Sequence, residues 1–181
     1  MKNLSRFVVV AVFWALVVHA ADNVNKSAHG NITHLDTASK TVVVKTKQGT
    51  ELTLNFIDTT TVRGVDKAAA GAKSEFKGLS EGSEVIVHYW QGDSGTTAYE
   101  IDKVGKDGVK YVDGTVSKVG KDGKTVVVKA ADGTEHTFDV VGNDTADAAK
   151  KIGKASNKAG KVTVFYTEDS GKKVAHFFEK L

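Results

Sequence analysis

The sequence predicts a mainly β protein that consists of two small five-stranded barrels in tandem. A strand-like stretch, Lys-Thr-Val-Val-Val-Lys, occurs at residues 40–45 and again at 124–129. Short runs with alternating apolar residues surround both copies, which is the pattern of half-buried strands. The chain also has 18 glycines and no proline, so glycine, asparagine and aspartate must supply the special backbone angles of its turns.

An internal duplication explains this organisation. Residues 40–53 and 124–137 are identical at 10 of 14 positions when they are aligned with a shift of 84. The shift falls to 77 at the fourth strand and to 76 at the fifth, where Ile101 is aligned with Phe177. Residues have therefore been lost mainly between the third and fourth strands, where loops tolerate change. Each unit has roughly 70 to 75 residues, a size at which a single core is only marginally stabilising.

The first unit is expected over residues 29–105, after a flexible polar leader at 21–28. Ile32 and Leu35 mark its first strand, and their spacing of three breaks strict alternation and indicates a β-bulge or an early turn. A short helix is predicted within 66–76, where alanine and lysine predominate. The five strands are predicted around residues 32–35, 41–47, 52–56, 85–90 and 98–101.

The second unit, expected over residues 111–181, repeats this order with a better-formed helix. Asp144 or Thr145 can cap the helix, and its alanines share one face with Ile152. The connection between the units, residues 104–113, is rich in glycine, lysine and aspartate. It is predicted to be short and exposed.

Strand, strand, strand, helix, strand, strand is the element order of an OB-like barrel, in which a short helix lies between strands 3 and 4. The sequence also carries the motifs Gly-x-Val, Thr-Val-Val-Val, Asp-Gly-Thr and Gly-x-x-Val-x-Val. In these motifs it resembles a family of secreted bacterial domains of unknown function that often occur in tandem, across about 29–105 and 111–181. The resemblance implies two OB-like barrels and supplies no catalytic residues, since its motifs specify turns and core.

Residues 1–20 have the features of a secretory signal peptide. Lys2 and Arg6 form a positive segment, an apolar run of about a dozen residues follows, and Val-His-Ala at 18–20 has the usual cleavage spacing. The alternative is an uncleaved membrane anchor. With cleavage, we expect an exported protein, periplasmic or extracellular, whose mature chain has no membrane span.

Charge and cysteine content exclude several classes of function. Loss of Lys2 and Arg6 lowers the formal net charge from +3 to about +1, and Arg63 is then the only arginine. Nucleic-acid binding is therefore not expected. Cysteine is absent, which rules out disulfides, thiolate nucleophiles and cysteine-zinc sites.

Trp90, His88 and Tyr99 form the candidate ligand-binding cluster. Aromatic side chains on the strand face of an OB-like barrel can stack on bases or sugar rings. Trp90 is aligned with Thr167 and His88 with Phe165, so such a site would belong to the first unit alone. The alternative is a surface aromatic cluster, or one buried between the two units, since aromatic residues are common at interfaces.

Histidine spacing gives no indication of a metal site. A metal site on one strand or helix commonly uses histidines two, three or four residues apart. No two of the five histidines after the signal have this spacing; they are His29, His34, His88, His136 and His176. We therefore predict no metal and no cofactor, although histidines can still converge through the fold.

Two lysines of the first unit recur in the second. They are expected to form charge pairs on a solvated sheet face or, alternatively, an anion-binding stripe. These lysines are Lys40 and Lys45, and Lys124 and Lys129.

The sequence contains no motif for catalysis. It has no Ser-His-Asp arrangement, nucleophile elbow, phosphate loop or zinc-binding helix motif. The leading hypothesis is therefore a non-enzymatic exported protein that binds an envelope protein, a glycan or a small ligand through its barrels. The second is a structural or assembly module of the cell envelope without a ligand pocket. A hydrolase is the third hypothesis. It is ranked last because the sequence offers no paired acid and base.

Overall fold

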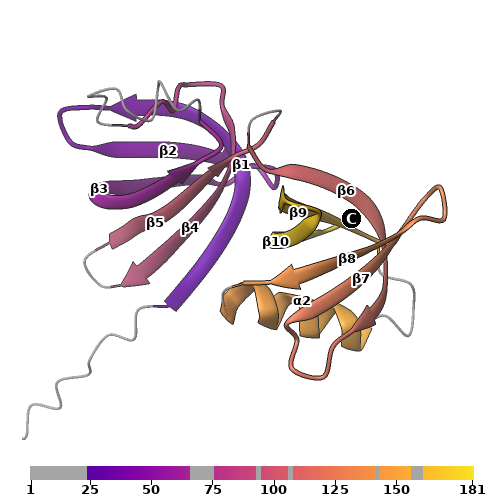
Figure 1. Ribbon diagram of the computed structural model, residues 1–181. Coiled ribbons are helices and arrows are strands. Elements are labelled where there is room, and N and C mark those ends of the chain that lie inside the picture. The colour runs from indigo at the N-terminus through magenta and orange to yellow at the C-terminus, as the bar shows by residue number, and fades with distance from the viewer. Residues whose placement is uncertain (1–23, 66–75, 93–94, 106–107, 142, 156–160) are drawn as a thin grey trace, which may run out of the picture.

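The computed structural model describes residues 24–65, 76–92, 95–105, 108–141, 143–155 and 161–181. The described residues form ten strands and one helix, arranged as two closed barrels that lie side by side (Figure 1). The predicted signal peptide and almost all of the first predicted helix lie outside the described residues. Within the described ranges, no helix combines the length and the apolar character needed to cross a lipid bilayer.

The first barrel closes five strands in the spatial order β1-β2-β3-β5-β4, with β4 pairing back onto β1. Its pairs are antiparallel except for β3 with β5. This confirms the predicted five-stranded barrel. The strands are β1 (Val24–Asp36), β2 (Thr41–Thr46), β3 (Glu51–Arg63), β4 (Glu84–Gly92) and β5 (Gly95–Lys103).

The second barrel repeats this topology, with the equivalent pair β8 and β10 parallel. Its helix follows the third strand, as predicted, and lies across one end of the barrel (Figure 1), where Ala149 is buried in the core. The elements are β6 (Lys110–Val119), β7 (Thr125–Ala130), β8 (Glu135–Val140), α2 (Asn143–Ala155), β9 (Lys161–Asp169) and β10 (Lys172–Lys180).

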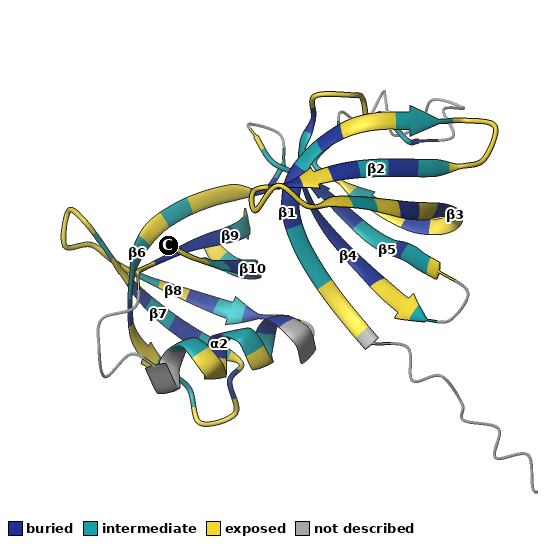
Figure 2. Cartoon of the chain, turned by 180° about the vertical axis from the view of Figure 1, so that it is seen from behind, coloured by how far each residue is buried: buried dark blue, intermediate teal, exposed yellow. Residues whose placement is uncertain are grey.

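Each barrel has its own core, and the duplicated valine stretch is part of both. Val42 and Val44 on β2, like Val126 and Val128 on β7, are fully buried. Figure 2 shows how buried residues alternate with less buried ones along these strands. The four flanking lysines are exposed, as expected. The valines of the repeated stretch therefore build the two cores.

The first strand confirms one prediction and corrects another. Its register with β2 shifts between Ile32 and His34, which is the predicted bulge. The predicted flexible leader at 21–28 is wrong from Val24 onward, because these residues extend β1 and pair with β4. Asn25, Lys26 and Ser27 are polar, so this stretch shows no apolar alternation. Backbone pairing with β4 holds it in the barrel, and Ala28 packs against the first core.

The connection between the barrels is less exposed than predicted. β6 already begins at Lys110, and an isolated backbone bridge joins Val104 to Val109. Val109 is fully buried and packs with Ile86 of β4 and Phe165 of β9. This apolar cluster contains residues of both barrels, so the connection helps to dock one barrel onto the other.

Strand β4 is buried on both of its faces. Val85, Val87 and Tyr89 belong to the core of the first barrel, while Ile86 and His88 on the opposite face are also buried. An antiparallel strand with two buried faces is covered by a second layer. Here the second barrel is that layer, and the polar residues around His88 are enclosed where the barrels meet.

Candidate metal centre between the two barrels

Three side chains of the kind that bind metal ions lie on the outer face of β4 and β5. His88 is the direct cross-strand partner of Glu100, and Ile86 is the partner of Asp102. Glu100 and Asp102 share one face because side chains alternate along a strand. The ligating atoms of His88, Glu100 and Asp102 all lie within 4.8 Å of one another. The strand ladder thus brings an imidazole and two carboxylates together.

Asp102 is the most unusual member of this cluster. Its side chain is 0% exposed, and neither carboxylate oxygen accepts a hydrogen bond from a described residue. His88 Nε2 lies 3.6 Å and His176 Nδ1 3.8 Å from Oδ2, and Arg63 Nη1 lies 3.9 Å from Oδ1. Burying a carboxylate in this way costs on the order of several kcal/mol. Such a group in a folded protein commonly indicates a bound ion or water.

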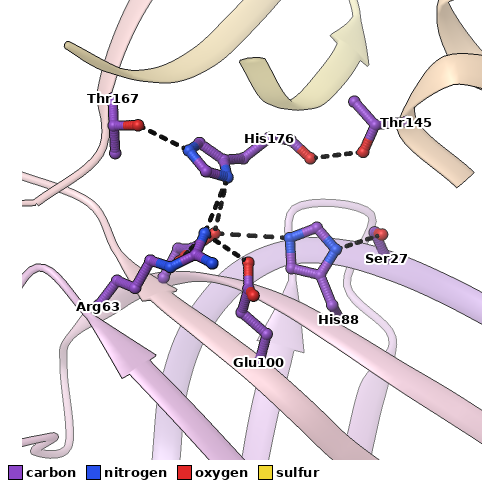
Figure 3. Close-up of polar contacts among 8 residues, drawn as sticks. Ser27, Arg63, His88, Glu100, Thr145, Thr167 and His176 are labelled. Carbon is purple, nitrogen blue, oxygen red and sulfur yellow. Dashed lines mark hydrogen bonds and ion pairs between the residues drawn. The ribbon is translucent and has the colours of Figure 1, made fainter. Parts of the chain in front are cut away.

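The second barrel contributes His176 to the same cluster. The β9–β10 register shifts between Ala175 and Phe177, so His176 is the extra residue of a bulge, a feature that re-aims a side chain. Figure 3 shows its ring between Thr167 and Arg63. The ring Nε2 lies 2.8 Å from Thr167 Oγ1, and Nδ1 lies 3.2 Å from Arg63 Nη1.

These two contacts fix the tautomer of His176. A guanidinium group can only donate hydrogen bonds, so Nδ1 of His176 accepts from Arg63 and the ring proton resides on Nε2, which donates to Thr167. The backbone oxygen of His176 accepts a hydrogen bond of 2.8 Å from Thr145 Oγ1. A neutral imidazole whose remote N–H is held by another group is the form in which histidine binds metals. His176 therefore presents a nitrogen lone pair to the cluster.

Burial also controls protonation in the cluster. Burial raises the pKa of Glu100 above its ordinary value, the nearby charge of Asp102 raises it further, and Arg63 acts in the opposite direction. Burial lowers the pKa of His176, which agrees with the neutral tautomer. Glu100 therefore needs a positive partner to be ionised beside Asp102. Arg63, whose Nη1 lies 2.9 Å from Glu100 Oε1, supplies part of that charge.

A cavity of about 210 Å³ gives access to the cluster. A water molecule takes about 30 Å³ of liquid volume, so the cavity accommodates a hydrated ion or a small ligand. Larger cavities of about 390 Å³ lie elsewhere, but the described residues around them form no comparable metal-ligand cluster. Both barrels supply its lining: Arg63, His88, Tyr99, Glu100, Val141, Thr145 and His176.

A second polar contact joins the barrels at His29. Its side chain is buried, with Nε2 2.9 Å from Glu84 Oε1 in the first barrel and Nδ1 2.8 Å from Glu179 Oε2 in the second. The ring also packs on Phe165, with 4.6 Å between ring centroids. Only a doubly protonated imidazole donates from both nitrogens. In that form His29 is a cation that links one carboxylate of each barrel.

Glu84 makes this link sensitive to acid. Hydrogen bonds from Lys47 and from His29 lower the pKa of Glu84 below its ordinary 4.5. The resulting stabilisation is fully present above about pH 4.5 and is lost as pH falls through the lowered value. We expect Glu84→Gln to reduce the free energy of unfolding at about pH 6 and to have a smaller effect at about pH 3. Urea unfolding of both proteins at the two pH values measures this, and an equal difference at both would contradict it.

The structure brings together the three residues predicted as a ligand cluster. The rings of Trp90 and Tyr99 stack with centroids 5.0 Å apart, and the ring of His88 lies 6.0 Å from that of Tyr99. Trp90 is 37% exposed. His88 is buried, with Nδ1 2.9 Å from Ser27 Oγ and Nε2 facing Asp102. His88 thus belongs to the buried cluster, while Tyr99 lines the cavity and Trp90 stacks on Tyr99.

The alignment of the fifth strand is wrong by one residue. Ile101 lies in the first core, and its counterpart in the second core is Phe178 rather than Phe177. The bulges agree with this correction. Tyr99 is the extra residue of the bulge in the first barrel and His176 is the extra residue in the second, so these two residues are aligned. The shift of 77 that holds for the fourth strand therefore continues through the fifth.

With this correction, the two copies differ most on the faces that meet. The first barrel has His88 and Glu100 at outward positions where the second has Phe165 and Phe177. The phenylalanines pack into the apolar cluster between the barrels, and the polar residues form the candidate metal centre. The duplication therefore supplied one apolar and one polar version of the same surface.

Four members of the site were not predicted from the sequence. Glu100 and Asp102 carried a usable signal, since they alternate on a strand that pairs with the strand of His88. Arg63 lies beside Asp102 through the parallel β3–β5 pairing, which local periodicity does not reveal. His176 comes from the other barrel, and its approach depends on docking.

Known proteins resemble this chain only weakly. The sequence matches no protein-family model and no curated protein. Among solved structures, Ag(I)CusF is 13% identical with a TM-score of 0.33, over 44% of this chain and 97% of that protein. Apo-CusF from Escherichia coli is 12% identical with a TM-score of 0.35, over 50% of this chain and 100% of that one.

Proposed function

We propose that this chain is an exported, non-enzymatic protein that binds one divalent transition-metal ion between its two barrels. His88, Glu100, Asp102 and His176 would hold the ion. The observation that most supports this function is the fully buried Asp102 carboxylate, whose oxygens accept no hydrogen bond from a described residue. A metal ion would supply the missing positive partner.

The distances are close to those that an ion requires. Nitrogen and oxygen ligands at about 2.1 Å around a tetrahedral ion are about 3.4 Å from one another. Asp102 Oδ2 lies 3.6 Å from His88 Nε2 and 3.8 Å from His176 Nδ1. Small side-chain shifts therefore suffice for coordination. Thr167, which accepts from the remote nitrogen of His176, would orient this ligand as metal-binding histidines commonly require.

The ligand set indicates which ions bind. Two imidazole nitrogens and two carboxylate oxygens suit Zn²⁺, Cu²⁺ and Ni²⁺, whereas soft monovalent ions prefer thiolate and thioether sulfur. The chain has no cysteine, and its single methionine is Met1. We therefore expect divalent ions to bind much more tightly than Ag⁺.

Isothermal titration of residues 21–181 with Zn²⁺ tests the proposed function. We expect one ion per chain, and a change in Trp90 fluorescence because Trp90 stacks on Tyr99 at the cavity. His88→Gln should weaken binding strongly. The matched control is His34→Gln, which removes an exposed histidine paired with Glu81 outside the cluster. Absence of binding, or equal losses in both variants, would reject the site.

A structural module without a ligand is the second candidate. The observation in its favour is that Arg63 and His29 already connect the barrels through polar contacts with His176 and Glu179. In that case the cluster would serve only docking, and replacing any member would destabilise the protein. The two functions therefore predict opposite changes in the stability of the ion-free protein when Asp102 is replaced. Replacement is stabilising if Asp102 serves to bind a cation, and destabilising if it serves docking.

A further inference from the structure

Arg63 ends β3 and extends its guanidinium group into the candidate metal centre. Its Nη1 lies 2.9 Å from Glu100 Oε1, 3.2 Å from His176 Nδ1 and 3.9 Å from Asp102 Oδ1. Figure 3 shows the group between His176 and Glu100. Arg63 thus contacts or approaches three of the four side chains that would hold the ion.

A guanidinium group and a metal ion cannot use these side chains at the same time. Nδ1 of His176 has one lone pair in the ring plane, and it accepts either the N–H of Arg63 or an ion. Two cations within a few ångströms of each other in a poorly solvated site also repel strongly. Ion binding therefore requires that Arg63 leave its position. The side chain of Arg63 is 42% exposed, so it can swing into solvent without crossing a core.

We infer that Arg63 is a built-in substitute cation that occupies the centre in the ion-free protein and is exchanged for the metal ion. This inference rests on the proposed function. In the ion-free protein, Arg63 balances part of the charge of Glu100 and Asp102 and keeps the two barrels together through His176. A divalent ion brings one more positive charge than the guanidinium group that it replaces, whereas a monovalent ion brings no additional charge. Arg63 therefore sets both the affinity and the preference for divalent ions.

Arg63→Gln tests the exchange. We expect this variant to bind Zn²⁺ at least 10-fold more tightly than the wild type in isothermal titration, because no internal cation has to be displaced. Its ion-free form should melt at a lower temperature, and Zn²⁺ should raise the melting temperature by more than in the wild type. Arg63→Lys, which keeps the charge, should lie between the two. Lys110→Gln is the matched charge control, since it breaks only an exposed pair with Glu168.

The outcomes separate this inference from the proposed function. Zn²⁺ binding by the wild type with equal or weaker binding by Arg63→Gln overturns the exchange and leaves the metal site standing; Arg63 would then position the ligands. Failure of both proteins to bind Zn²⁺ rejects the metal site and the exchange together. An ion-free Arg63→Gln protein as stable as the wild type also overturns the exchange, because Arg63 would not be balancing the buried carboxylates.

Discussion

Asp102→Asn is expected to weaken metal binding strongly and at the same time to stabilise the ion-free protein. The substitution keeps the shape of the side chain and removes a buried negative charge whose oxygens accept no hydrogen bond from a described residue. Removal of this incompletely paired charge should raise the free energy of unfolding, because the desolvation cost of a buried charge can exceed its Coulombic gain. Loss of a direct ligand should weaken Zn²⁺ binding by at least about 100-fold, since even supporting residues of metal sites cost 10- to 100-fold. Urea unfolding with and without Zn²⁺ and isothermal titration measure the two effects.

The matched control is Asp113→Asn in the second barrel. Asp113 is exposed and accepts a hydrogen bond of 2.7 Å from Thr163 Oγ1. The same chemical change there should lower stability slightly and leave Zn²⁺ affinity unchanged. The result that would contradict this is a destabilised Asp102→Asn protein together with no Zn²⁺ binding by either the wild type or this variant. The cluster would then be a docking network, and the structural function would replace the metal-binding one.

The opposite signs expected for stability and binding have a common physical basis. A site that will receive a cation must hold negative charge in place before the ion arrives, and that charge is unfavourable in a poorly solvated environment. Arg63 reduces this cost but does not hydrogen-bond to Asp102, since the closest approach is 3.9 Å. If the proposed function is correct, the ion-free protein is less stable than it could be, as is common where binding function and stability compete.

The barrels could be predicted from the sequence because their signals are local. Val42 and Val44 alternate on one strand, and their repetition as Val126 and Val128 shows that the same core was built twice. The start of β1 could not be predicted in this way. Residues from Val24 onward are held by backbone pairing with β4. Backbone hydrogen bonds form regardless of the side chain, so they do not produce an alternation of apolar residues.

The candidate site was only partly predictable, for a different reason. His88 was predicted as part of a ring cluster with Trp90 on one strand face, and its neighbour Glu100 follows from the antiparallel pairing of β4 and β5. His176 reaches the site only because two barrels dock in one orientation. Docking depends on surfaces that belong to separate units, and no periodicity within either unit encodes it.

Phe165→Ala is expected to weaken the docking of the two barrels. The side chain of Phe165 is 3% exposed, and it packs with Ile86 and Val109 and against the ring of His29. Truncation of a buried phenylalanine costs about 3–5 kcal/mol. Because this energy lies between the barrels rather than within one core, we expect urea unfolding to separate into two transitions where the wild type shows one.

Phe165→Ala should also weaken Zn²⁺ binding by about 10- to 100-fold, because the proposed ligand His176 lies near the other three only when the second barrel is docked. The control is Val126→Ala, which truncates a fully buried residue in the second core. That variant should lose stability but keep the single transition and the wild-type affinity. A single transition with unchanged affinity in Phe165→Ala would show that the polar contacts alone hold the barrels in register. His29 and Arg63 would then be the residues that maintain docking, and Glu179→Gln rather than Phe165→Ala would separate the barrels.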